Sequence, residues 1–279
     1  MKTRIIVDST ADLLPHLQER VHVIPMTLRF GDQEYIDGVT IDRQTFYQKL
    51  IDSKEYPTTS QASPAKFIEE YEKAKEAGES AVVITLASKF SGTYQSACIA
   101  AVDYDDVYVV ESGTVAVGGG ILVERAIQLR DQGLSAKEIV DRLNEEKDKI
   151  VVIALVDTLE YLKRGGRVSK SVAFAGTMLN IKPMIEIIHG EVLMAGKARG
   201  IKQGNALLMQ EIEKVGGVDF NKPVLLGYTG LTDAPLLKFI DESRVVLADH
   251  LSEVHYTCIS SVLGTHAGPG AVAVAFFKK

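Results

Sequence analysis

The sequence has little cysteine and no excess of basic residues, and both absences narrow the possible functions. Only two of its 279 residues are cysteines, Cys98 and Cys258, and they lie far apart in the chain. This spacing fits neither a zinc site nor a disulfide framework, and it favours a reducing compartment. Acidic side chains outnumber basic ones by 37 to 31, which gives a net charge of −6. Nucleic acid is therefore not an expected partner, because it selects a basic surface.

Long apolar runs and the short motifs of several enzyme classes are also missing. The first apolar run, Ile5 to Val7, is far too short for a secretion signal, and no run reaches the ~18 residues of a membrane span. We therefore expect a cytoplasmic protein without a transmembrane segment. The sequence contains no H-E-x-x-H, no G-x-S-x-G and no G-x-x-x-x-G-K-[ST], and its six histidines form no metal spacing. These absences predict no metal, no cofactor and no organised catalytic set.

What is present in the first part of the chain is an alternation of apolar strands and helices. Strands are expected at 4–7, 80–88, 106–112 and 150–157, and helices at 12–19, 43–52, 64–77, 91–104, 115–132 and 135–148. This order is typical of a three-layer α/β domain, in which a parallel sheet carries helices on both faces. The segment 21–38 mixes strand alternation with turns and predicts a hairpin.

The second part of the chain pairs its strands differently. Two strands are expected within 183–200 around a turn at His189 and Gly190, and others at 223–229, 253–260 and 271–277. Helices are expected between them, at 171–179, 203–215 and 233–242. This pattern predicts a smaller α/β domain of the α+β type. We place the boundary at Leu162, which gives domains 1–162 and 163–279 joined by a basic, Gly-rich segment.

Two hydroxyl-rich loops stand where strands or loops run into predicted helices. The segment "TSQASP" includes Thr59 and Ser60, and the segment "SGTYQSA" begins with Ser91, Gly92 and Thr93. Each segment can serve as a helix cap and nothing more. However, a helix start with spare hydroxyl and N–H groups is also a natural anion site, and ligands of parallel sheets gather at the carboxyl ends of the strands.

One histidine and three arginines lie in Gly-rich surroundings. His266 stands in "GTHAGPGA", which predicts either a tight turn with a structural histidine or a loop that leaves the imidazole accessible. Arg164 and Arg167 belong to "KRGGRVSK" and Arg199 to "GKARGIK"; each is either a solvated charge or a contact for an anion or a partner. The apolar segments "SVAFAGTMLNIKPMIEII" and "AVAVAFF" can form an ordinary core or line an apolar tunnel, and periodicity does not separate the two.

Seven motifs occur in an order that resembles a known family. They are "IIVDSTADL", "TSQASP", "SGTYQSA", "LEYLKRGGRVSK", "IKPMIEI", "GKARG" and "GTHAGPGA". Together they are similar to the DegV family of bacterial fatty-acid-binding proteins over roughly residues 5–279.

The resemblance implies a tunnel at the junction of the two domains that holds a long-chain fatty acid such as palmitate, stearate or oleate. Hydroxyls of the two loops and the histidine would meet its carboxyl group. The ligand-binding residues expected on this basis are Thr59, Ser60, Ser91, Gly92, Thr93 and His266.

The resemblance also implies a partner. Some members of the family present the bound carboxyl group to a separate fatty acid kinase, which makes acyl phosphate for phospholipid synthesis. On this basis the protein is not an enzyme by itself, and Arg164, Arg167 and Arg199 belong to the rim and the kinase-facing surface. Transient contact with a membrane surface is compatible with this role. Two alternatives stay open: a phosphotransferase or hydrolase that uses His266, and a lipid-sensing adaptor.

Overall fold

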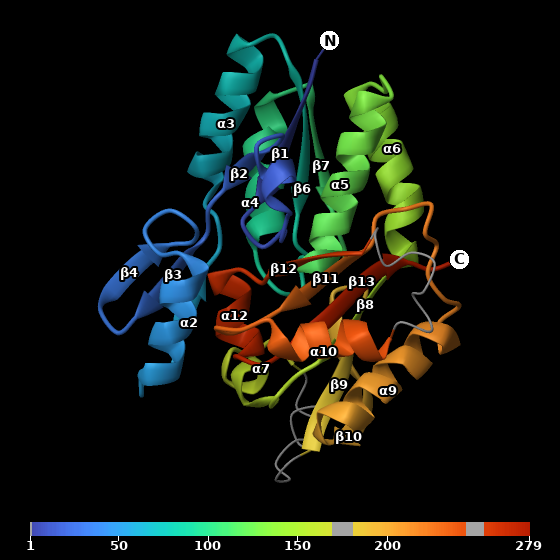
Figure 1. Ribbon diagram of the computed structural model, residues 1–279. Helices are drawn as coiled ribbons and strands as arrows, with labels where there is room; N and C mark the ends of the chain where they lie inside the picture. The colour runs from blue at the N-terminus through green and yellow to red at the C-terminus, as the bar shows by residue number, and fades with distance from the viewer. Residues whose placement is uncertain (1, 169–180, 244–253) are drawn as a thin grey trace.

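The computed structural model describes residues 2–168, 181–243 and 254–279, and it contains two main sheets (Figure 1). The first sheet is parallel throughout and has the order β2-β1-β6-β7. Its strands are β1 (Thr3–Asp8), β2 (His22–Ile24), β6 (Ser80–Thr85) and β7 (Val107–Glu111). The parallel sheet predicted from the amino-terminal alternation is therefore confirmed. The predicted helix at 171–179 and Lys170 of the basic segment lie outside the described residues.

Helices cover both faces of this parallel sheet, as a three-layer domain requires. In Figure 1, α3 (Pro64–Glu76) and α4 (Thr93–Ala100) lie on one side, and α5 (Val117–Asp131) and α6 (Ala136–Glu146) on the other. The consecutive residues Ile5, Ile6 and Val7 of β1 are all fully buried. A strand that is covered on both faces needs such a continuous apolar run, because successive side chains point to opposite faces.

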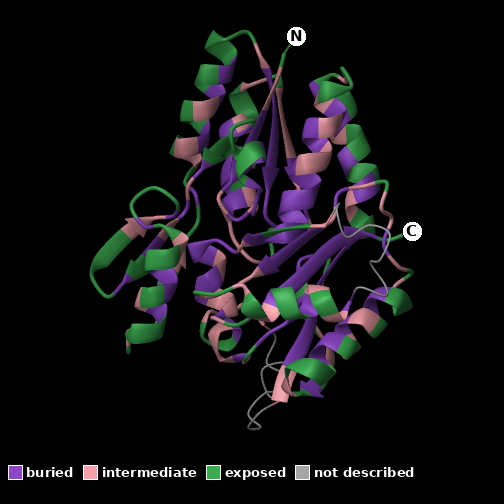
Figure 2. Cartoon of the chain, in the orientation of Figure 1, coloured by how far each residue is buried: buried purple, intermediate pink, exposed green. Residues whose placement is uncertain are grey.

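The second main sheet has six strands in the order β10-β9-β8-β13-β11-β12, and its pairing is mixed. Its strands are β8 (Ile150–Leu155), β9 (Ile181–Ile188), β10 (Glu191–Arg199), β11 (Leu225–Tyr228), β12 (His255–Cys258) and β13 (Val272–Phe277). Two helices, α9 (Gly200–Lys214) and α10 (Ala234–Glu242), accompany it. In Figure 2 the central strands of both sheets, such as β1, β6, β8 and β13, are mostly buried, while the helices expose their outer faces.

The strand predicted at 150–157 lies in a different sheet from the one that the sequence indicated. Strand β8 pairs antiparallel with β9 and β13, so it lies within the six-stranded sheet rather than at the end of the parallel one. The chain therefore changes sheet before Ile150, although the division into domains at Leu162 stays a prediction. A nearly continuous apolar run such as β8 indicates burial on both faces, but it does not identify the neighbouring strands.

A third, small sheet forms beside the parallel one. Its antiparallel order is β4-β3-β5, and its strands are β3 (Thr27–Phe30), β4 (Gln33–Ile36) and β5 (Thr58–Ser60). The hairpin predicted within 21–38 is confirmed by β3 and β4. Helix α2 (Arg43–Asp52) follows the hairpin. Three short α-helices, α1 (Pro15–Gln18), α7 (Glu160–Arg164) and α12 (Ser261–Ala267), and two 3-10 turns, η1 (Ala101–Asp103) and η2 (Lys147–Lys149), complete the described fold.

Helix α5 packs between the two main sheets and contacts strands of both. Its first turn contains three consecutive glycines. A Cβ atom on Gly120 would overlap the carbonyl oxygen of Asp12, and one on Gly118 would overlap side-chain atoms of Thr114 and Val152. The Gly-rich start of α5 therefore lets the helix approach its neighbours closely.

Candidate functional site

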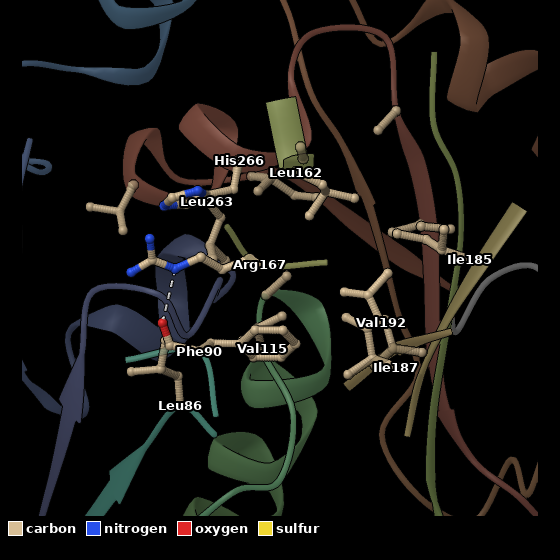
Figure 3. Close-up of a pocket in the computed structure, with 18 of the residues that line it drawn as sticks. Leu86, Phe90, Val115, Leu162, Arg167, Ile185, Ile187, Val192, Leu263 and His266 are labelled. Carbon is tan, nitrogen blue, oxygen red and sulfur yellow. Dashed lines mark hydrogen bonds between the residues drawn. The ribbon is translucent and has the colours of Figure 1, made fainter. Parts of the chain in front are cut away.

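A cavity lies between the carboxyl end of the parallel sheet and one face of the six-stranded sheet (Figure 3). The cavity and its mouth together contain about 910 Å³ of atom-free space, part of which is open to solvent. The parallel sheet contributes residues that follow its strands: Met26 after β2, Leu86 after β6 and Val115 after β7. The cavity thus occupies the edge where parallel sheets bind their ligands.

Most of the wall is apolar, and its side chains come from alternate positions of neighbouring strands. Strand β8 and the residue after it provide Val152, Ala154 and Val156, while Ala271 and Ala273 come from the start of β13. Because side chains alternate between faces of a strand, these residues share one face of the six-stranded sheet. In Figure 3 the apolar wall at one end consists of Ile185, Ile187 and Val192.

The opposite end of the cavity is polar. In Figure 3, Arg167 and His266 lie at the far side from Ile187 and Val192. The polar side chains of the described wall are Thr59, Gln61, Ser91, Arg167 and His266. An elongated apolar space with hydroxyl, amide, imidazole and guanidinium groups at one end suits a ligand with an apolar tail and an acidic head.

His266 lies in the last turn of helix α12, not in a loop as its Gly-rich surroundings predicted. Its Nε2 atom is 3.0 Å from Oγ1 of Thr59, and its Nδ1 atom is buried without a hydrogen-bond partner among the described residues. A Cβ atom on Gly165 would overlap the imidazole, so the basic loop packs directly against the ring. Burial, and then the charge of Arg167, lower the pKa of His266 to about 4. The imidazole is therefore neutral at neutral pH.

The "TSQ" segment divides its side chains between the cavity and the solvent. Thr59 is half-buried and lines the cavity, whereas Ser60, the next residue of β5, is exposed and is absent from the wall. Gln61 lines the cavity again, and its amide Nε2 donates a hydrogen bond of 3.0 Å to Oγ of Ser96. Sequence reasoning placed Gln61 in the polar cluster but not among the ligands. The period of two that starts from Thr59 is the signal that identifies it.

The "SGT" segment contributes one side chain to the wall, that of Ser91. Thr93 is fully buried; its Oγ1 lies 2.9 Å from Oγ of Ser91 and accepts a 3.3 Å hydrogen bond from the backbone N–H of Ala62. Gly92 precedes α4, and a Cβ atom there would overlap the Gln61 side chain. Gly92 and Thr93 therefore hold the two loops together, and Ser91 is the member of the three that faces the cavity.

Arg167 differs from its predicted place at the rim, because its side chain lies in the cavity wall. Its Nε atom donates to the carbonyl oxygen of Phe90 at 3.1 Å, and Nη1 donates to that of Gly165 at 2.5 Å. These two carbonyl groups turn the guanidinium inward. Among the described residues of the wall, Arg167 is the one lysine or arginine. It can pair with an anionic ligand, and a guanidinium fits a carboxylate particularly well.

The other two arginines do not line the cavity. Arg164 is exposed, forms an ion pair with Glu160 at 2.7 Å and places its guanidinium carbon 3.8 Å from the ring centre of Tyr56. Arg199 is exposed at the end of β10, just before α9 begins. Thr59, Ser91, Arg167 and His266 thus converge, whereas Arg164 and Arg199 face the solvent elsewhere.

The remaining chemistry of the described chain is limited. Within residues 2–168, 181–243 and 254–279, no three His, Cys, Asp or Glu side chains are grouped so that they could hold a metal ion. The same part of the chain contains no helix long and apolar enough to cross a membrane.

Comparison with known proteins places the chain in one family. The family model described as an uncharacterised protein of the DegV family matches residues 2–279. A DegV domain-containing protein of Caldanaerobacter subterraneus is 34% identical to this chain over 284 residues, which cover 100% of the chain and 99% of the relative.

Solved structures of similar proteins have the same fold. The structure of a DegV family protein from Thermus thermophilus, described by its fatty acid binding, has a TM-score of 0.89 and 31% identity, and covers 99% of this chain and 100% of its own. A stearic acid-binding protein from Eubacterium ventriosum has a TM-score of 0.87 and 27% identity, and covers 100% of this chain and 99% of its own. The α/β fold with a parallel sheet and a cavity between two sheets, the family model and these relatives agree, and the chain belongs to the DegV family.

Proposed function

We propose that this protein binds one long-chain fatty acid in the cavity, with the carboxyl group at the Arg167–His266 end and the tail toward Ile187 and Val192. The observation that carries the proposal is the division of one cavity into a long apolar part and a single polar end. The fatty acids named for the related structures, such as stearic acid, have the same division.

Burial of the tail would supply most of the affinity. Each buried methylene contributes ~0.8 kcal/mol, so a chain of about sixteen carbons offers on the order of 12 kcal/mol before the costs of ordering are subtracted. The head group would be held by the Arg167 guanidinium and by the hydroxyls of Thr59 and Ser91. Because His266 is neutral, it adds no positive charge to that of Arg167. The charge of the Arg167 guanidinium would then balance that of the ligand carboxylate.

We further propose that the protein presents the carboxyl group to a separate fatty acid kinase. Thr59, Ser91 and His266 are half-buried rather than sealed in the core, which is compatible with approach of a phosphoryl donor. Arg164 lies on α7, which contacts α12, and its exposed guanidinium suits a partner surface. Arg199 is the second exposed arginine assigned to this role.

A stand-alone enzyme that uses His266 as a base is a weaker candidate. A general base works best when its pKa is close to the working pH, and that of His266 is lowered to about 4. Its Nδ1 atom also has no carboxylate or other hydrogen-bond partner among the described residues that would orient the ring. A neutral, weakly basic imidazole is better suited to hydrogen bonding with a head group.

The test combines lipid analysis with two arginine variants. Protein purified from a bacterial host should carry extractable fatty acid by mass spectrometry, and delipidated protein should bind palmitate or oleate. Arg167→Ala should bind either fatty acid more weakly, by about 1–3 kcal/mol, because the carboxylate loses a charged partner. Arg164→Ala, the matched control outside the cavity, should bind normally but slow acyl phosphate formation by the cognate kinase with ATP.

Two results would contradict the proposal. Wild-type protein that carries no lipid and binds neither fatty acid would overturn the binding function. Acyl phosphate formed with ATP and magnesium in the absence of a kinase would instead support the enzyme.

A further inference from the structure

The entry into helix α12 is held by two carboxylates from the amino-terminal part of the chain. Asp12 is the last residue of the "DSTAD" segment, and its Oδ1 accepts the backbone N–H of Ser260 at 2.8 Å. Asp37 follows β4, and its Oδ1 accepts the backbone N–H of Ser261 at 3.2 Å. Ser260 is the residue that precedes α12, and Ser261 is its first residue. Both carboxylates therefore bind N–H groups that a helix start leaves without a partner inside the helix.

Helix α2 strengthens the same attachment. Arg43 contacts Oδ1 of Asp12 at 3.2 Å through Nη2, and its Nη1 donates to Oγ1 of Thr257 at 3.0 Å. The hydroxyl of Tyr47 donates to the carbonyl oxygen of Ile259 at 3.0 Å. A Cβ atom on Gly264 would approach the ring of Phe46 to within 2.7 Å and that of Tyr47 to within 2.8 Å, so α12 lies tightly against α2. Side chains of α2 therefore hold both the connection from β12 to α12 and helix α12 itself.

These carboxylates are costly to bury. Asp12 is 0% and Asp37 5% exposed. Burial raises the pKa of both, that of Asp12 to about 7. The Oδ2 atoms of both residues have no hydrogen-bond partner among the described residues. Buried polar groups of this kind often specify one arrangement of the chain rather than add stability.

The arrangement that they specify contains the His266–Thr59 contact. Asp37 follows β4 and Thr59 lies on β5, and both strands pair with β3 of the small sheet. Helix α12 is thus tied to this sheet at both of its ends, by Asp37 at the first residue and by Thr59 at His266. A helix of seven residues is only ~10 Å long. The position of its first residue therefore largely fixes that of the imidazole in its last turn.

We propose that Asp12 and Asp37 are positioning residues, which clamp the start of α12 so that His266 keeps its place beside Thr59 at the polar end of the cavity. The part of this inference that concerns affinity rests on the proposed binding of fatty acid. The part that concerns the imidazole does not, because the clamp and the contact both belong to the protein without ligand.

The most selective test removes a donor rather than a carboxylate. Ser261→Pro deletes the N–H group that Asp37 accepts, and proline is well tolerated at the first position of a helix. The preceding residue, Ser260, has φ −57° and ψ 159°, the extended conformation that a following proline requires. Asp37→Ala removes the acceptor, and Asp37→Asn is the conservative variant that retains an oxygen for the bond. Glu146→Gln is the matched control, since Glu146 is a buried acid paired with Arg125 away from α12.

Two readouts separate positioning from general stability. In lipid-free protein, the pKa of His266 measured by NMR should rise from about 4 toward its ordinary value of about 6.5 in Ser261→Pro and Asp37→Ala, because a displaced ring becomes hydrated. Oleate affinity should fall about tenfold in the same two variants. Asp37→Asn and Glu146→Gln should leave the pKa of His266 and the affinity close to wild type. The double variant Asp37→Ala/Ser261→Pro should be little worse than either single one.

The outcomes are decisive in each case. Folded Ser261→Pro with an unchanged pKa of His266 would overturn the inference, even if its melting temperature were lower. If Asp37→Ala does not fold, Ser261→Pro decides in its place by the same pKa measurement. Failure of the wild type to bind oleate would remove the proposed function, whereas the titration of His266 would still test the clamp.

Discussion

The two faces of the six-stranded sheet are made by the same strands but are filled differently. Along residues 271–276, alanines point to the face of the cavity and larger residues to the opposite face, while Phe277 at the end of β13 places a large, fully buried side chain on the same side as the alanines. The cavity side has Ala271, Ala273 and Ala275, and the opposite side has Val272, Val274 and Phe276. The larger residues pack with Leu208 and Ile212 of α9 and with Leu236 and Phe239 of α10.

The comparison shows how a sheet can provide stability on one face and space on the other. A core packed at crystal-like density has no room for a ligand. Small side chains at alternate positions of β13 leave that room without interrupting the hydrogen bonds of the strand. The face with larger residues then makes apolar contacts that compensate for those missing beside the cavity. The next four predictions test this division, from the largest expected effect to the smallest.

The largest effect is expected from truncation on the packed face. Phe276 is fully buried there, and Phe276→Ala should lower the free energy of unfolding by about 3–5 kcal/mol, because it removes apolar contacts and leaves a void. Urea unfolding of delipidated protein measures the loss, and Phe276→Leu serves as the milder control. The affinity of the folded variant for oleate should stay near wild type. A large drop in affinity would show that the two faces are not independent.

A matched pair on β13 tests the other face. Ala273 lines the cavity, whereas Ala275, two residues further on, is fully buried and absent from the wall. Ala273→Leu should weaken oleate binding by about 2–3 kcal/mol, because the added carbons displace about three methylenes of the tail, and stability should change little.

The same substitution at the neighbouring position should have the reverse effect. Ala275→Leu should keep the affinity and lower stability by about 1–3 kcal/mol through overpacking. Titration with oleate and urea unfolding of both variants give the comparison. Equal behaviour of the two variants would mean that the space beside Ala273 is not where the tail lies.

The polar end of the cavity should contribute less to the free energy of fatty acid binding than burial of the tail. His266→Ala should weaken fatty acid binding by about 1–3 kcal/mol, since a buried acidic head loses one partner, while most of the affinity survives through the tail. Ser60→Ala is the matched control in the same region, and it should have little effect because Ser60 is exposed. Wild-type affinity in His266→Ala would mean that the histidine has only a structural role and does not help to bind the head group.

Counted per pH unit, the smallest effect is a pH dependence of stability. The pKa of His266 is about 4 in the folded protein and about 6.5 when unfolded. Between these values the unfolded state binds more protons, so stability falls as the pH is lowered, by at most ~1.4 kcal/mol per pH unit. The raised pKa of Asp12 acts in the opposite direction, because its folded form binds the extra proton below about 7.

The difference between wild type and His266→Ala isolates the histidine. Stability measured by urea unfolding from pH 7 to pH 4 should decline less in the variant than in the wild type. Parallel pH profiles would show that the imidazole is hydrated in the folded protein and would weaken its place in the buried polar end.

Several features of this protein are determined by local sequence. The continuous run Ile5–Val7 specifies a strand that is buried on both faces, and the alternation that follows specifies the parallel sheet. Ser91 comes after β6, at the edge where ligands of parallel sheets gather. Thr59 lies on β5 of the small sheet, and its meeting with Ser91 was implied by the resemblance to a family. His266 was associated with them through the resemblance to a family, not through any local pattern.

Other features were decided by the tertiary structure. The apolar run of β8 fits either main sheet, and hydrogen bonds to β9 and β13 decide between them. The basic loop can face the solvent or the interior, and the carbonyl groups of Phe90 and Gly165 turn Arg167 inward while Arg164 stays exposed. The alternation of small and larger side chains in β13 indicates that the strand has two different faces. It does not show which of the two faces is packed against other elements. That depends on α9 and α10, because a void exists only where no distant element arrives to close it.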